Sequence, residues 1–226
     1  MQKRSEHLRK LVLLAMLAAI SYLIVSYIRI PVVLFLKYEP KDVIITIGGF
    51  LLGPMASFII SLVVSLIEMV TVSDTGPTGA LMNLLSTCSF ACTAAFIYKK
   101  KRSLAGAIWG LAIGSVAMVG IMLLWNWLIS PYYMFEIKSP EDLANARSAV
   151  EALLLPAFLP FNLLKGALNS VLAMALYKPL ANALRKTGLL PERPATAEGS
   201  RLGMYLFMGA LLITCTLLFL TLRGVL

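Results

Sequence analysis

Three polar side chains share one face of a long apolar run in the C-terminal half of the chain. Asn162, Lys165 and Asn169 stand at i, i+3 and i+7 within residues 153–176, a spacing that puts them on one side of a helix. An ionisable group inside an apolar run is costly and usually faces a cavity. This face is therefore a candidate site for a small polar ligand.

Lys165 has a second interpretation that the sequence leaves open. Its ammonium could reach the membrane surface or pair with a structural carboxylate instead of meeting a ligand. Lys165 lies about a dozen residues from either end of its run, roughly 18 Å along a helix, which makes the membrane surface hard to reach.

A further polar residue, Asn126, stands near the predicted outer end of the preceding apolar run, between Trp125 and Trp127. The tryptophans suit an interfacial aromatic belt, and Asn126 is the better candidate for a pocket. Two loops, residues 37–42 and 73–79, are predicted on the same side. They are either plain connections or a lid over the pocket.

Motifs for catalysis are absent from the sequence. It has no phosphate-binding GxxxxGK[ST] loop and neither an HExxH nor a GxSxG motif. No two carboxylates stand together inside an apolar run, and Cys88 and Cys92, four residues apart, have no histidine nearby. We predict no catalytic residue, no metal site and no enzyme activity. Energised transport by this chain would need a partner that supplies the energy.

The elements that position these side chains follow from composition. Of the 226 residues, 59% are hydrophobic and 14% charged, whereas soluble domains have about 45–50% and about 25%. The composition predicts an all-α integral membrane protein. The apolar runs, each long enough to cross the hydrocarbon, are residues 11–28, 43–67, 81–98, 104–128, 153–176 and 202–222.

Charge distribution indicates how these runs cross the membrane. If residues 43–67 formed one span, the basic cluster 99–102 would lie outside, against the positive-inside rule. A break at Gly53-Pro54 returns it to the cytoplasm. The N-terminus, this cluster and residues 178–201 then hold 13 of the 20 Lys and Arg residues on the inner side. We predict seven spans with a cytoplasmic N-terminus. The net charge of +9 is therefore a topology signal and a candidate surface for lipid or an ATPase, and it does not indicate nucleic-acid binding.

The Gly53-Pro54 break makes the second span short. Residues 43–52 span only about 15 Å as a helix, although Pro40 suits an earlier start. We expect this helix to be partly buried among the others. Short segments of this kind point to binding sites in membrane transport proteins.

Several segments together resemble a known family. The chain is similar to the substrate-binding membrane subunit, or S component, of an energy-coupling factor (ECF) transporter, most closely the riboflavin-specific one. The resemblance covers roughly residues 8–185. The matching stretches are residues 15–19, 36–43, 49–54, 75–83 and 160–166.

The resemblance implies a six-helix vitamin-binding domain over residues 1–185. Residues 186–201 would then be a cytoplasmic linker and residues 202–226 an additional transmembrane helix that the six-helix family does not need. The resemblance also implies a multi-pass protein of the bacterial cytoplasmic membrane that captures riboflavin with high affinity at the outer face. The predicted ligand contacts are Asn126, Asn162, Lys165, Tyr38, Lys41, Asn83, Thr75 and Gly76.

The partners follow from the same resemblance. Ala15 and Ala19, four residues apart in the first span, would dock onto a transmembrane coupling protein, since small residues allow helices to approach closely. Packing within the monomer is the alternative. Two cytoplasmic ATPases would use ATP, and the chain would carry no cofactor of its own. An S component for another vitamin, or a membrane scaffold without a ligand, remains an alternative function.

Overall fold

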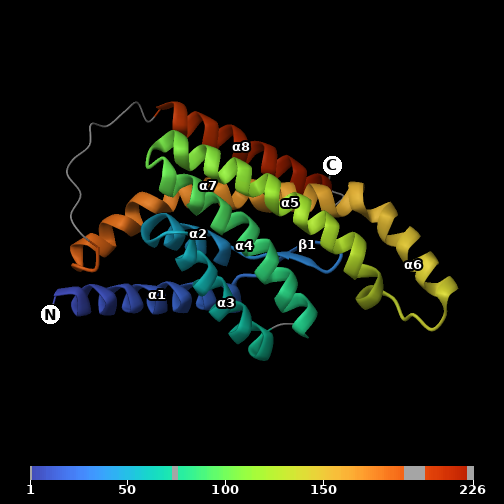
Figure 1. The fold of residues 1–226 in the computed structure, drawn as a ribbon. Helices are drawn as coiled ribbons and strands as arrows, with labels where there is room; N and C mark the ends of the chain where they lie inside the picture. The colour runs from blue at the N-terminus through green and yellow to red at the C-terminus, as the bar shows by residue number, and fades with distance from the viewer. Residues whose placement is uncertain (1, 73–75, 191–201, 223–226) are drawn as a thin grey trace.

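The computed structural model describes residues 2–72, 76–190 and 202–222, and these residues form a helical bundle (Figure 1). Five helical segments in this part of the chain are long and apolar enough to cross a membrane. The predicted all-α architecture is confirmed. The helices are α1 (Gln2–Tyr27), α2 (Lys41–Leu52), α3 (Pro54–Thr71), α4 (Gly76–Lys100), α5 (Leu104–Met134), α6 (Pro140–Leu153), α7 (Leu159–Lys186) and α8 (Leu202–Leu222).

The predicted break within residues 43–67 is confirmed. Helix α2 ends at Leu52 and α3 begins at Pro54, with Gly53 at φ 101° between them. That conformation suits glycine, and proline is favoured in the first turn of a helix. All ten residues from Lys41 to Phe50 are buried, so α2 is enclosed by other helices as its shortness predicts.

The basic ends of the helices lie together. Figure 1 shows the start of α1, the connection between α4 and α5, and the end of α7 at one end of the bundle. The segment between α1 and α2 and the connection between α5 and α6 lie toward the other end. This arrangement needs α2 and α3 to be separate passes, as the charge distribution predicts.

The segment after α1 folds as a β-hairpin, which the sequence did not predict. Strands β1 (Ile30–Val33) and β2 (Leu36–Tyr38) are antiparallel, with Ile30 opposite Tyr38. Leu36 and Tyr38 are buried, whereas Lys37 between them is half-buried. This alternation is that of a strand with one face toward the core.

Two predicted helix ends are wrong. The apolar run 104–128 continues as α5 to Met134, with Pro131 inside the helix, so Asn126 lies well within α5 and not just before a loop. The predicted run 153–176 does not begin as a separate helix either. The chain is helical from Pro140 through α6, a π-helical turn at Leu154–Phe158 and α7. The wider turn accommodates prolines that cannot make normal helix hydrogen bonds.

Helix α8 packs on the outside of the bundle. It runs from the end where α7 finishes back toward the hairpin (Figure 1), and it contacts α7 and β1. Cys215 is buried in a cluster with Val32 and Leu36 of the hairpin and with Phe161 and Leu164 of α7.

Glycine on α2 permits the close packing of α2, α3 and α4. A Cβ atom at Gly49 would overlap Ser57 Oγ and come within 2.7 Å of Ala95 Cβ. We therefore expect Gly49→Ala to lower stability in detergent by about 1–3 kcal/mol, as overpacking does. Gly120 on α5 has nothing within 4 Å of such an atom, so Gly120→Ala is the control and should leave the melting temperature unchanged or slightly higher. A Gly49→Ala protein as stable as the control would contradict the packing.

Candidate functional site

The polar face of α7 forms the base of the candidate site. Asn162, Lys165 and Asn169 are all buried, as their shared face predicts. The Lys165 ammonium Nζ lies 3.1 Å from Asp42 Oδ2 and 3.1 Å from Ser86 Oγ. Lys165 thus pairs with a structural carboxylate, one of the two interpretations open from the sequence, and it also lines the cavity described below.

Asp42 is the centre of a hydrogen-bond network. Its side chain is fully buried. Thr87 Oγ1 donates to Oδ1 at 2.7 Å, and Asn169 Nδ2 donates to Oδ2 at 3.4 Å. Asn169 Oδ1 in turn accepts from the Tyr38 hydroxyl at 3.0 Å. Burial, and next the charge of Asp42, raise the pKa of Tyr38 on β2, so the phenol keeps its proton and remains a donor.

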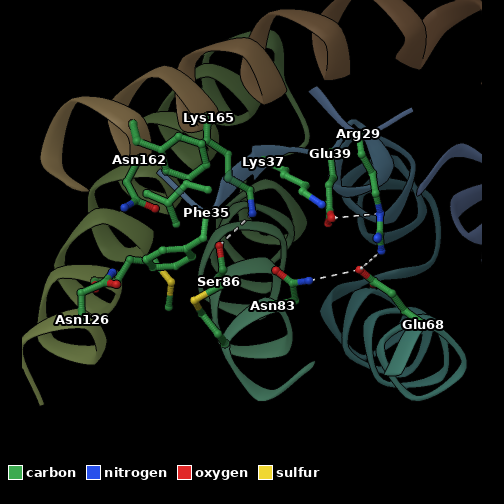
Figure 2. A pocket seen from close by; sticks show the side chains of 14 residues that line it. Arg29, Phe35, Lys37, Glu39, Glu68, Asn83, Ser86, Asn126, Asn162 and Lys165 are labelled. Carbon is green, nitrogen blue, oxygen red and sulfur yellow. Dashed lines mark hydrogen bonds and ion pairs between the residues drawn. The ribbon is translucent and has the colours of Figure 1, made fainter. Parts of the chain in front are cut away.

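Above this network lies a cavity of about 180 Å³, shown in Figure 2. The hairpin contributes Phe35, Leu36 and Lys37 to its wall. The Phe35 ring packs edge-on against Tyr133 at a centroid distance of 5.7 Å. The remaining wall comes from the helices and from the ends of the hairpin segment. These residues are Arg29, Glu39, Glu68, Met82, Asn83, Ser86, Met122, Asn126, Phe161, Asn162 and Lys165.

One end of the cavity carries two carboxamides. Asn126 Nδ2 donates to Met122 O at 2.7 Å, and its Oδ1 accepts from Ser130 at 2.8 Å. Asn162 Nδ2 donates to Phe158 O at 2.8 Å. An amide nitrogen carries two hydrogens and an amide oxygen two lone pairs. Each side chain therefore retains capacity for a ligand while its orientation is fixed by its own helix.

The opposite end of the cavity carries a cluster of charged side chains that are buried or half-buried (Figure 2). Glu68 Oε1 accepts from Arg29 Nη2 at 3.2 Å and from Asn83 Nδ2 at 3.1 Å. Lys41 pairs with Glu68 Oε2 and lies 2.8 Å from Glu39 Oε2. These contacts tie the hairpin segment to α2, α3 and α4. We call Arg29, Glu39, Lys41 and Glu68 the charged cluster.

The predicted ligand contacts divide into three groups. Asn126, Asn162, Lys165 and Asn83 line the cavity. Tyr38 and Lys41 do not line it; they are buried beside it in the Asp42 network and in the charged cluster.

The third group lies at the start of α4. Gly76 is the first residue of that helix, with φ 59°, and is not among the residues that line the cavity. Thr75 lies outside the described residues.

Sequence reasoning missed Asp42, Glu39, Glu68, Arg29, Ser86 and Phe35 as parts of the site or of its support. Glu39 and Asp42 fall in the loop 37–42 that the sequence predicts on the side of the pocket. The available signal was their position, because each charged residue stands within a few residues of an apolar run. Charges so placed must find partners once the runs pack.

Comparison with known proteins gives a family match over most of the chain. Residues 9–177 match the family model described as ECF transporter, substrate-specific component. The match ends before α8. It includes every residue that lines the cavity.

Two relatives match more than two thirds of this chain. The riboflavin transporter RibU of Staphylococcus aureus (strain TCH60) is 30% identical over 182 residues, which is 79% of this chain and 93% of the relative. The riboflavin transporter FmnP of Bacillus subtilis (strain 168) is 28% identical over 170 residues, 72% of this chain and 87% of the relative.

A solved structure has a similar fold. It is described as the S component of a bacterial ECF transporter, and it superimposes with a TM-score of 0.63 and 28% sequence identity. The similarity covers 79% of this chain and 99% of that one. The bundle described above is thus a known transporter architecture.

Glu68 holds two cations and one amide donor, so its charge should be essential for stability. We expect Glu68→Gln to destabilise the protein by about 3–5 kcal/mol, as loss of one member of a buried ion pair does. The control is Glu136→Gln, which removes the exposed pair with Lys138 at 3.0 Å and should cost at most about 1 kcal/mol. Thermal unfolding in detergent compares the two. Equal effects would mean that the charged cluster does not support the fold.

Proposed function

The chain belongs to the family of ECF transporter substrate-specific components, and from this premise we propose that it is the subunit that binds riboflavin with high affinity for uptake. Membership makes the chain a membrane transport protein and not an enzyme. The single observation that carries the choice of ligand is the convergence of Asn126, Asn162 and Lys165 on one buried cavity. The names of the relatives support it.

The chemistry of the cavity suits a flavin. The polar edge of the riboflavin ring presents carbonyl acceptors around one N–H donor. Asn126 and Asn162 each offer a donor and an acceptor for such an edge, and Lys165 offers donors only. Phe161 and Met122 supply apolar contact for the rest of the ring. Sites with mostly apolar walls and a few placed polar groups are usual for small ligands.

The size of the cavity implies that the hairpin moves. Ligand pockets usually measure about 300–1,000 Å³, and this cavity holds about 180 Å³. Phe35, Leu36 and Lys37 form part of its wall, and the hairpin is joined to the bundle by short connections. We therefore assign to the hairpin the role of a lid that shifts when riboflavin enters.

The proposed topology has the N-terminus in the cytoplasm. Then the basic segment 99–102 and the end of α7 face the cytoplasm, in agreement with the positive-inside rule, and the cavity opens toward the outer face. In this scheme residues 1–185 are the vitamin-binding domain. Residues 186–201 are a cytoplasmic linker, and α8 crosses the membrane as a seventh span.

Uptake also requires partners. We propose that α1 docks onto a transmembrane coupling protein that carries two cytoplasmic ATPases, and that only these ATPases use ATP. Ala15 and Ala19 are exposed on α1, whereas Ala18 is buried. Exposure of the two small residues favours docking over packing within the monomer, and it leaves room for a partner helix to approach closely.

The ligand is tested by titration of the purified full-length protein with riboflavin. We expect a yellow protein that quenches flavin fluorescence with submicromolar affinity. Asn162→Ala should weaken binding by about 5–150-fold, since an unsatisfied buried contact costs about 1–3 kcal/mol. Asn182→Ala, at an exposed position on the same helix, is the control and should bind like the wild type.

The same titration tests the alternatives. A chain that binds a different vitamin and not riboflavin would be an S component of other specificity. A chain that binds no vitamin would favour the scaffold function and contradict the proposal.

Docking through α1 is tested by a bulky substitution. Ala15→Trp or Ala19→Trp should abolish riboflavin uptake by cells while leaving riboflavin affinity unchanged, because the indole blocks the partner but lies away from the cavity. The control is Ile213→Trp on an exposed face of α8, which should retain uptake. Equal loss of uptake and binding in the α1 variants would contradict docking at this face.

A further inference from the structure

Asp42 lies beneath the cavity without being part of its wall. It is fully buried, yet its Oδ2 atom is 3.1 Å from Lys165 Nζ, which does line the cavity. Resting on the proposed function, we propose that Asp42 is a positioning residue for riboflavin: it holds the Lys165 ammonium toward the ligand and links it to the lid.

The arrangement of donors supports the first part of this role. The Lys165 ammonium has three N–H donors. One is directed at Asp42 and one at Ser86 Oγ, which leaves one for the cavity. A lysine side chain has four rotatable bonds and little intrinsic direction. Two acceptors, Asp42 beneath the cavity and Ser86 in its wall, therefore decide where the remaining donor lies.

The second part follows from the contacts on the other side of Asp42. Asn169 donates to Asp42 Oδ2 and accepts from the Tyr38 hydroxyl. Tyr38 ends strand β2, and Leu36 and Lys37 of the same strand line the cavity. One carboxylate thus fixes both the cation at the base of the cavity and, through Asn169, the strand that covers it.

A purely structural carboxylate would stabilise the bundle without acting on the ligand through Lys165. The two roles differ in a double-mutant cycle, because residues that act through one another give non-additive effects. The cycle combines Asp42→Asn with Lys165→Met and measures riboflavin affinity of the full-length protein in detergent.

We expect each single variant to bind riboflavin about 10–100-fold more weakly. Adding Asp42→Asn to Lys165→Met should weaken binding by less than about threefold more, since Asp42 then has no ammonium to position. This last comparison does not need Asp42→Asn alone to fold. In Lys165→Met the Asp42 carboxylate loses its cation but keeps the hydrogen bonds from Thr87 and Asn169, and a thermal melt in detergent checks that this variant is folded before its affinity is compared. A further tenfold loss in the double variant would overturn the proposal.

The spectrum of bound flavin gives an independent readout. In Asp42→Asn, the absorption bands of bound riboflavin should shift toward those of Lys165→Met, because the ammonium has moved relative to the ring. Thr87→Val removes a different hydrogen bond to Asp42 and leaves the contact with Lys165 in place. It is the control and should keep the wild-type spectrum.

The outcomes separate this inference from the proposed function. If the wild type does not bind riboflavin, the proposed function fails and the inference with it. Two results would overturn only the role of Asp42 in a wild-type protein that binds riboflavin. In the first, Asp42→Asn weakens affinity in the Lys165→Met protein as much as it does alone. In the second, Thr87→Val shifts the flavin spectrum as Asp42→Asn does.

Discussion

The structure depends on one constraint: charged side chains placed inside an apolar bundle must be paired there. An isolated ion in a medium of low dielectric constant is so unfavourable that it would lose its charge or open the fold. Beside the cavity, three cations and three anions form pairs of opposite charge within 4 Å of each other. These pairs dictate which elements meet around the cavity. The six are Arg29, Lys41, Lys165, Glu39, Asp42 and Glu68.

The short helix α2 meets this constraint with two adjacent residues. Lys41 and Asp42 are turned by about 100° from each other, so they point to different neighbours. Lys41 pairs with Glu68 of α3, and Asp42 pairs with Lys165 of α7. Asp42 also lies in the first turn of α2, where a negative charge is favoured by the helix dipole. A twelve-residue helix buried along most of its length therefore joins the two ends of the cavity.

Much of the fold was predictable, because its signals are local. Gly53-Pro54 interrupts an apolar run, basic clusters mark helix ends, and the spacing of Asn162 and Lys165 defines a helix face. The partners of those side chains were not predictable, since Asp42 and Lys165 are 123 positions apart by number and no periodicity relates them. The hairpin was missed for a different reason: its alternation covers only a few residues between the long helix α1 and the short helix α2. The chain stays helical through Pro156 because of a π-helical turn, and the presence of a proline does not by itself predict such a turn.

The position of α8 is compatible with the two proposed roles of the bundle, which are binding of riboflavin in the cavity and docking onto a partner through α1. It lies beyond the region that matches the family, and it packs on α7 and β1. Ala15 and Ala19 of α1 are exposed in the presence of α8, so the added helix leaves the proposed docking face open. Its contact with the hairpin has an energetic consequence. Leu36 packs in the cluster that contains Cys215, so any lid movement that separates them exposes apolar surface at about 25 cal/mol per Å² if water enters, and less if lipid does. The contact with α8 therefore favours the position that the hairpin has in this structure.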